Sequence, residues 1–276
     1  MTNLLFSGLV LGGSIVAGFV GSLTGLGGGV VILPMLTIAF GVNMRYAIGA
    51  SLISVIATSS GAAAAYVRDG FSNVRIGMML EIATAAGALG GAALAAYVPT
   101  SKLAILLGVV LIGSVFAPVH REPDGTLPSS PEKTGGRLSG SYPGPHGPVQ
   151  YKAKRVPLGF GMMGVAGLLS GLLGIGSGAV KVLAMDMAMG LPFKVSTTTS
   201  NFMIGVTAAA SAGIYLHRGY VDPGLAMPVT LGVVAGSLTG ATLLKNASVH
   251  GLRMFFRAVI LVLGAEMIYN GWTGRI

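Results

Sequence analysis

The sequence predicts an all-α polytopic membrane protein made of two homologous halves, each with about five apolar segments. Three observations predict this fold class: an apolar composition, a series of apolar runs, and a repeat with constant spacing. Apolar residues make up 53% of the 276 residues and charged residues only 9%, whereas a soluble domain carries about 25% charged residues. The mean hydropathy is +0.79. This composition excludes a soluble enzyme, a nucleic-acid-binding module and a disordered regulator.

Apolar runs mark the candidate membrane segments. Most of them approach or exceed the roughly 20 residues that a membrane helix needs. They lie near 4–24, 28–41, 46–67, 76–98, 101–119, 156–174, 178–191, 195–216, 223–244 and 252–271. The runs at 28–41 and 178–191 are too short for a complete span, which favours half-helices or re-entrant segments. The sequence thus predicts 8–10 transmembrane helices, depending on whether these two runs cross.

Residues 120–155 interrupt the apolar pattern. This stretch holds six prolines, many glycines and serines, and six basic residues. Because it cannot bury enough apolar area to fold, we expect a flexible linker. It separates an N-terminal transmembrane repeat, 1–119, from a C-terminal transmembrane repeat, 156–276.

The two halves are internal repeats. An offset of 149 residues aligns them without a gap, for example from Gly25 to Gly174 and from Ser51 to Ser200. The match continues through polar loops, where apolar composition does not explain it. Duplicated halves are typical of secondary transporters. If all five segments of each half cross the membrane, the repeats are inverted; if the short segments return, each half has four spans and the repeats are parallel.

The basic residues favour the inverted arrangement, with the linker on the cytoplasmic side. If the N-terminus is outside and every segment crosses, the linker and most other basic loops lie inside, as the positive-inside rule requires. The inside set is Arg68, Arg75, Lys194, Lys245 and the six basic residues of the linker, and the outside set is Arg45, Lys102, Arg218 and Arg275. We therefore expect a multi-pass protein of the cytoplasmic (inner) membrane, with the net charge of +9 explained by orientation.

A glycine loop occurs once in each half, as GLGGG at 25–29 and GIGSG at 174–178. Each follows a long apolar run and precedes a short one. A backbone with so little side chain can leave helical geometry, and the helix that follows presents free N–H groups that attract anions. The alternative is close helix packing through glycine. On the first interpretation, the substrate-binding residues are Gly27, Gly28, Gly29, Gly176, Ser177 and Gly178.

Polar side chains near these loops are further binding candidates. Ser51 and Ser200 occupy equivalent positions in the two halves, and Asn201 offers two amide donors to an acidic group. Their alternative role is hydrogen bonding between helices. Lys181 follows the second loop by about one helical turn and is expected either to face the same anion site, or to pair with Asp186 or reach the membrane interface.

Other charges within apolar runs are functional candidates because a buried charge is costly in a membrane. Glu81 lies near the start of its run, where a headgroup position and a proton-relay role are both open, and Glu266 is expected at an interface. The chain has no cysteine, and its four histidines lack metal-ligand spacing. We expect no cofactor, no metal and no enzymatic activity.

Several of these motifs resemble the sulfite exporter TauE/SafE family. They are the GxGGG loop followed by Pro34, the segment Gly49-Ala50-Ser51, and the stretch from Tyr66 to Gly70, with a degenerate copy in the second half. The resemblance implies a polytopic bacterial or archaeal inner-membrane carrier for sulfite or organosulfonates such as sulfoacetate.

The functional hypothesis is a secondary transporter that moves a small sulfur-containing anion. Because no ATP-binding motif is present, its energy is expected from the substrate gradient or from a coupling ion, H⁺ or Na⁺. Its partners would be the anion and the lipid bilayer, with a homodimer left open. The alternatives are an anion channel and a membrane assembly subunit without transport activity of its own.

Overall fold

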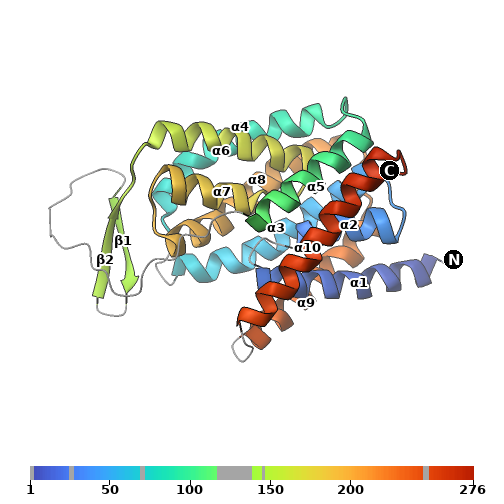
Figure 1. The fold of residues 1–276 in the computed structure, drawn as a ribbon, viewed down its shortest axis with the longest axis horizontal. Coiled ribbons are helices and arrows are strands. Elements are labelled where there is room, and N and C mark those ends of the chain that lie inside the picture. The colour runs from blue at the N-terminus through green and yellow to red at the C-terminus, as the bar shows by residue number, and fades with distance from the viewer. Residues whose placement is uncertain (1–2, 25–27, 69–71, 117–138, 145–146, 245–248) are drawn as a thin grey trace.

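The computed structural model describes residues 3–24, 28–68, 72–116, 139–144, 147–244 and 249–276, and within these ranges it is a helical bundle with one β-hairpin (Figure 1). The helices of the first half are α1 (Asn3–Thr24), α2 (Gly29–Pro34), η1 (Met35–Ala39, π-helical), α3 (Met44–Arg68), α4 (Val74–Leu94) and α5 (Thr100–Phe116). The second half contains α6 (Val156–Leu173), α7 (Gly178–Leu183), η2 (Ala184–Ala188, π-helical), α8 (Phe193–His217), α9 (Pro223–Leu244) and α10 (Val249–Trp272).

The element boundaries repeat with the offset found in the sequence. The segments α2, η1 and α3 recur 149 residues later as α7, η2 and α8, and the starts of α4 and α5 recur as the starts of α9 and α10. Within the described residues, each half therefore contains four long helices and one short helical segment. The short segments, 29–39 and 178–188, are roughly 16 Å long, about half of the hydrocarbon core of a bilayer.

Two described helices are long and apolar enough to cross a membrane, Val74–Leu94 and Val156–Leu173. Shorter apolar stretches lie at Leu4–Val20, Gly29–Ala39, Thr100–Phe116 and Pro223–Thr239. The apolar runs of the sequence predict 8–10 transmembrane helices, which is more than these two. The difference arises partly because long helices such as α8 carry buried hydroxyl side chains, including Ser196, Thr199 and Ser211, which face other helices and lower the apolarity without facing lipid.

The two halves are interleaved in the packing. Helix α1 packs against α9, and α4 packs against α6, while α5 meets α10 and α3 meets α8. Exchanging each helix for its counterpart reproduces the same set of contacts. Glycines make these approaches close: an added Cβ would collide with the Gly164 carbonyl oxygen at Gly87, and with the Ile15 carbonyl oxygen at Gly236. At these two positions the interpretation as helix packing is the one that the structure supports.

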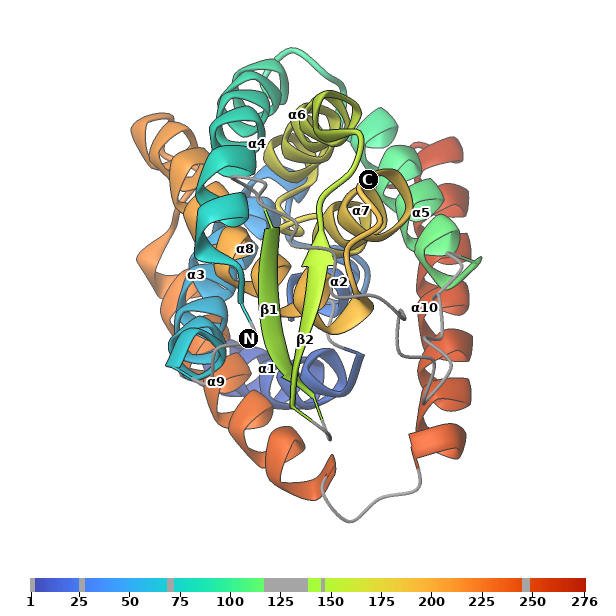
Figure 2. The ribbon, with the colours of Figure 1, turned by 90° about the vertical axis from the view of Figure 1, so that its left-hand side faces the viewer.

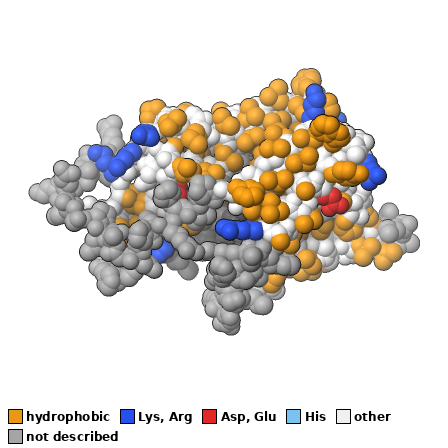
Figure 3. Space-filling model, in the orientation of Figure 1, with side chains coloured by type: hydrophobic (Ala, Val, Ile, Leu, Met, Phe, Trp, Pro, Cys, Tyr) orange, Lys and Arg blue, Asp and Glu red, His pale blue; other side chains and the backbone are white. Residues whose placement is uncertain are grey.

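The short helices lie inside the bundle, and the two ends of the bundle differ. Figure 2 shows α2 and α7 surrounded by longer helices, with the hairpin across this end. Both chain termini lie at the opposite end (Figure 1). Hydrophobic side chains cover the middle of the face drawn in Figure 3, with most Lys and Arg side chains toward the two ends. This distribution fits a protein embedded in a bilayer.

The hairpin lies within the stretch for which a flexible linker is expected. Strands β1 (Ser139–Gly144) and β2 (Gly147–Lys152) pair antiparallel. The Asn73 side-chain amide donates a hydrogen bond to the Tyr151 hydroxyl at 2.8 Å, and the Lys154 backbone N–H donates to the Met189 carbonyl at 2.9 Å. Composition misses the hairpin because these contacts attach it to distant helix ends. Linker residues 120–138 and 145–146 lie outside the described ranges.

Candidate functional site

The second glycine loop has a backbone that requires glycine at two positions. Gly174 ends α6 with φ +67°, and Gly176 has φ +72°. Ser177, with φ +43°, is also left-handed, which is unusual for a residue with a side chain. Its hydroxyl donates to the Ala166 carbonyl at 2.6 Å. The sequence prediction of a non-helical break at this loop is confirmed, and the serine is held by α6.

The first glycine loop differs in the part that the structure describes. Gly28 has φ −61° and ψ −26°, in the ordinary helical region. A Cβ at Gly28 would lie 2.7 Å from Val233 Cγ1. Gly27, the third predicted binding glycine of this loop, lies outside the described residues. The two loops are therefore equivalent in sequence position without sharing one backbone conformation.

The two halves meet beside these loops. The Ser51 hydroxyl on α3 donates to the Gly174 carbonyl at 2.9 Å. A Cβ at Gly29 would lie 2.7 Å from Ser51 Oγ and 3.4 Å from the same carbonyl oxygen. The structure thus brings Gly29, Ser51 and the second loop together, as expected for a site shared between the repeats.

The equivalent serine of the second half stays within its own half. The Ser200 hydroxyl donates to the Gly178 carbonyl at 3.3 Å, and Ile204 lies against Gly176 and Gly178. Asn201 follows Ser200 and is half-buried, about 100° around the helix from the face that meets α7. Ser200 therefore joins the second loop directly, whereas no hydrogen bond ties the Asn201 amide to either loop in the described chain.

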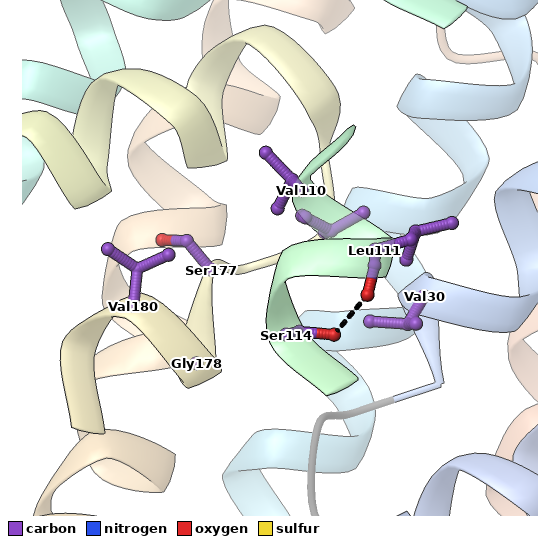
Figure 4. Close-up of a pocket in the computed structure, with 8 residues that line it drawn as sticks. Val30, Val110, Leu111, Ser114, Ser177, Gly178 and Val180 are labelled. Carbon is purple, nitrogen blue, oxygen red and sulfur yellow. Dashed lines mark hydrogen bonds between the residues drawn. The ribbon is translucent and has the colours of Figure 1, made fainter. Parts of the chain in front are cut away.

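A small cavity lies beside the second loop (Figure 4). It is lined by Val30 of α2, by Val110, Leu111 and Ser114 of α5, and by Ile175, Ser177, Gly178 and Val180. Its volume of about 20 Å³ holds roughly one water molecule. In Figure 4 the Ser177 hydroxyl points away from Ser114, whose hydroxyl donates to the Leu111 carbonyl at 2.6 Å. This conformation is too tightly closed for a bound sulfite.

Lys181 is buried inside the bundle and does not reach the membrane interface. Its side chain is 0% exposed, and Nζ donates a hydrogen bond to the Thr207 hydroxyl of α8. That hydroxyl donates to Glu81 Oε1 of α4 at 2.6 Å, and the Thr84 hydroxyl donates to Glu81 Oε2 at 2.9 Å. The expected pairing of Lys181 with Asp186 or its extension to an interface is therefore replaced by a buried link to Glu81.

The position of Glu81 also differs from the headgroup location considered for it. Three hydrogen bonds join α4 and α8 with the same separation of 126 residues: Asn73 to Thr199, Glu81 to Thr207, and Ala92 to Arg218. At about 1.5 Å per residue, Glu81 lies about 12 Å from the first contact and about 16 Å from the last. Since the hydrocarbon core is about 30 Å thick, this cluster lies near the middle of the span.

Thr207 and Thr84, the two hydroxyl residues bonded to Glu81, were not identified as functional from the sequence. The alignment of Thr207 with Thr58 in the other half was visible, but a buried threonine in a membrane helix usually bonds its own backbone. Thr207 also does this, since its hydroxyl donates to the Met203 carbonyl at 2.8 Å.

Among the described residues, no group of three or more acidic, His or Cys side chains could hold a metal ion.

Comparisons with known proteins identify one family and several relatives. The family described as "Sulfite exporter TauE/SafE" matches residues 10–267. The chain is 27% identical over 278 aligned residues to the probable membrane transporter protein YunE of Bacillus subtilis, covering 95% of this chain and 97% of that protein. It is 28% identical to the probable membrane transporter protein YdhB of the same organism, covering 82% and 84%. The probable membrane transporter protein MJ0441 of Methanocaldococcus jannaschii is 25% identical, with 96% of both chains covered. No solved structure matches.

Proposed function

The chain belongs to the sulfite exporter TauE/SafE family, and we propose that it is a secondary transporter that moves a small sulfur-containing anion, such as sulfite or an organosulfonate, across the cytoplasmic membrane. The names of the family and of its relatives indicate a membrane transporter. The observation that carries the proposal is the meeting of the two repeats at the glycine loops, where Ser51 of one half bonds Gly174 of the other. Secondary transporters place their substrate at such an interface between repeats.

We infer that the repeats are inverted. The Arg45 guanidinium at the start of α3 donates to the Ala96 carbonyl just beyond α4 at 3.0 Å, so α3 and α4 run in opposite directions. The constant separation of 126 residues between bonded residues of α4 and α8 means that these two helices run in the same direction. Helix α3 is therefore antiparallel to α8, its counterpart, which supports inversion.

The linker is proposed to face the cytoplasm. Supporting this, the hairpin and both termini lie at opposite ends of the bundle (Figure 1), and the six basic residues of 120–155 favour the inside. Because the native chain has no cysteine, Gln150→Cys and Thr273→Cys each provide one label position, and both residues are exposed. A membrane-impermeant thiol reagent added to intact cells should label Thr273→Cys alone. Labelling of Gln150→Cys alone would reverse the topology.

The anion site is proposed at the paired glycine loops near the midplane. Backbone N–H groups would bind the anion, and hydroxyl and amide side chains would add donors. The proposed residues are Gly27, Gly28, Gly29, Ser51, Gly176, Ser177, Gly178, Ser200 and Asn201. We leave Lys181 out because its ammonium group is bonded to Thr207. Since the cavity holds roughly one water, the loops must separate for the anion to enter, as alternating access requires.

Binding to purified protein tests this site. Sulfite and sulfoacetate should raise the melting temperature of the wild-type protein in detergent, and Gly28→Val should abolish the shift because its side chain, placed against Val233, forces the first loop out of position. Ser177→Ala is the matched mild variant: it keeps the backbone donor and loses a hydroxyl that already bonds Ala166. Wild-type affinity in Gly28→Val would contradict the proposed site.

Transport measurements separate the alternatives. A carrier should give saturable flux of labelled sulfoacetate in proteoliposomes, whereas a channel would not saturate at comparable concentrations. An assembly subunit would show no flux alone and would copurify with a stoichiometric partner. The coupling ion is expected to be H⁺ or Na⁺, which imposed gradients of each ion distinguish.

A further inference from the structure

The buried link between Lys181 and Glu81 has no role in the proposed anion site. Thr207 stands between the two ionisable groups, which form no direct ion pair in the described part of the chain. An ammonium group has three N–H donors, but Thr207 Oγ1 is the one acceptor bonded to Lys181 Nζ in that same part. The Lys181 side chain is 0% exposed and Glu81 is 7% exposed. A permanently charged lysine in a membrane interior would be poorly stabilised by this single bond.

The fold does not require the charged link. With the offset of 149, the counterparts of Lys181, Thr207 and Glu81 are Ile32, Thr58 and Thr230. Ile32 is fully buried, and the Thr58 hydroxyl bonds its own helix at Ser54 O, 3.0 Å away. The Thr230 hydroxyl is buried without a hydrogen-bond partner. The equivalent interface therefore packs without any charge, so Glu81 and Lys181 serve something other than assembly of the bundle.

In the described part of the elements packed against this link, the other titratable side chains lie toward the helix ends. Helix α6 contains none. Helix α8 carries Lys194 in its first turn and Tyr215 and His217 in its last turn, and α4 carries Arg75 near its start. Asp186 lies on η2, more than a turn beyond Lys181. Any proton held near the middle of these helices is therefore held by Glu81 or Lys181.

We propose that Glu81, Thr207 and Lys181 form a proton-carrying site that couples anion transport to the H⁺ gradient. In the unloaded state the pair has no net charge. One proton can shift from Lys181 Nζ to Thr207 Oγ1 while the Thr207 proton passes to Glu81 Oε1, which leaves a neutral amine and a carboxylic acid. A proton from water then binds the amine, and the loaded site carries one positive charge. Thr207 suits this relay because its single proton has two acceptors, Glu81 Oε1 at 2.6 Å and Met203 O at 2.8 Å.

This inference rests on the proposed transport function, because the link joins the proton site to the second glycine loop. Lys181 lies in α7, the short helix that begins at Gly178 of that loop. Glu81 lies in α4, a helix of the other half. Protonation of Glu81 removes the negative charge that attracts Lys181 across Thr207. The short helix is then held less tightly to α4, and the loop can move relative to the first half.

Infrared spectroscopy on purified protein tests the proton site without any substrate. The difference spectrum between about pH 5 and pH 9 should contain a carboxyl C=O band that Glu81→Gln removes. Lys181→Met should shift the pH at which this band changes, because the neighbouring charge is lost. Thr58→Val, which alters the equivalent hydroxyl of the other half, should leave the band unchanged. Identical difference spectra for the wild type and Glu81→Gln would overturn the proposal.

Proteoliposomes with an internal pH dye test the coupling. Sulfoacetate is the probe because both of its acid groups are ionised at pH 7, so a dye response reports protons moved by the protein. A sulfoacetate gradient should drive proton movement in the wild type and in Thr58→Val, and at least about tenfold less in Glu81→Gln. Sulfoacetate flux without proton movement in the wild type would overturn the coupling but leave the transport function standing. Absence of sulfoacetate flux would instead contradict this substrate, while the infrared band still decides whether the proton site exists.

Discussion

Two interfaces related by exchange of the repeats, α4 with α8 and α9 with α3, differ in charge at equivalent positions. Helix α8 carries Thr207 against Glu81 of α4, and α3 carries Thr58 where α9 has Thr230. Lys181 completes the first interface, and Ile32 occupies its place in the second. Both interfaces hold long helices together at the same depth of the bundle. Both copies of the interface therefore pack, but only one of them contains the ionisable pair Glu81 and Lys181.

The largest expected effect comes from breaking the charged link on one side. Glu81→Leu leaves Lys181 buried without its carboxylate, which should destabilise the protein by about 3–5 kcal/mol. Thr230→Val is the matched change in the other interface. It removes a hydroxyl that has no partner, so it should alter stability by less than about 0.5 kcal/mol. Thermal unfolding in detergent measures both variants.

Removing both charges tests whether Glu81 and Lys181 stabilise each other. Replacing a buried ion pair with apolar residues of similar size is often neutral or stabilising. The double variant Glu81→Leu/Lys181→Met should therefore recover most of the stability that Glu81→Leu loses, because it recreates the uncharged interface around Ile32. A double variant as unstable as Glu81→Leu would show that the two side chains do not interact.

Glycine contacts should behave alike in the two halves. Gly87 of α4 and Gly236 of α9 are counterparts, and an added Cβ would strike a backbone carbonyl oxygen at both. Gly87→Val and Gly236→Val should each cost about 1–3 kcal/mol through overpacking, measured as a loss of melting temperature in detergent. Gly213, which has open space around it, is the control position. Strong loss in one variant alone would show that the packing is less symmetric than the contacts indicate.

Much of the fold could be predicted because the repeat is detectable in the sequence. The constant offset places α3 and α8, and α2 and α7, at equivalent positions, and the structure has them there. The hairpin could not be predicted from the composition of 120–155. Its strands are short and rich in glycine and proline, and it is attached through Tyr151 to Asn73, a residue far away in the chain.

The two charged residues of the buried link could be identified from the sequence, but their arrangement could not. Lys181 and Glu81 stand out because they are charges within apolar runs. Their link depends on how α4 packs against α8, and no local pattern specifies that register. The left-handed conformation of Ser177 could not be predicted either, because a residue with a side chain rarely adopts a positive φ.

The starts of α4 and α9 offer a weaker contrast. The Asn73 side chain accepts a hydrogen bond from Ile76 N at 3.0 Å and caps α4. Its counterpart Asp222 accepts one from Gly224 N at 2.8 Å. Each change to alanine should cost about 1 kcal/mol. Asn73→Ala should cost more than Asp222→Ala, because it also loses the bond to Tyr151. Equal losses of melting temperature would mean that the hairpin contact adds no stability.

The smallest expected effect concerns the backbone difference between the glycine loops. Ser177 has a left-handed backbone that costs a non-glycine residue roughly 1–2 kcal/mol, while its hydroxyl bond to Ala166 contributes about 1 kcal/mol. Ser177→Ala keeps the strain and loses the bond, so it should destabilise the protein by about 1 kcal/mol. Ser177→Gly loses the same bond and relieves the strain, so its melting temperature should stay close to that of the wild type. The reverse order of the two variants would mean that the left-handed conformation of this loop is not the one that the protein adopts in solution.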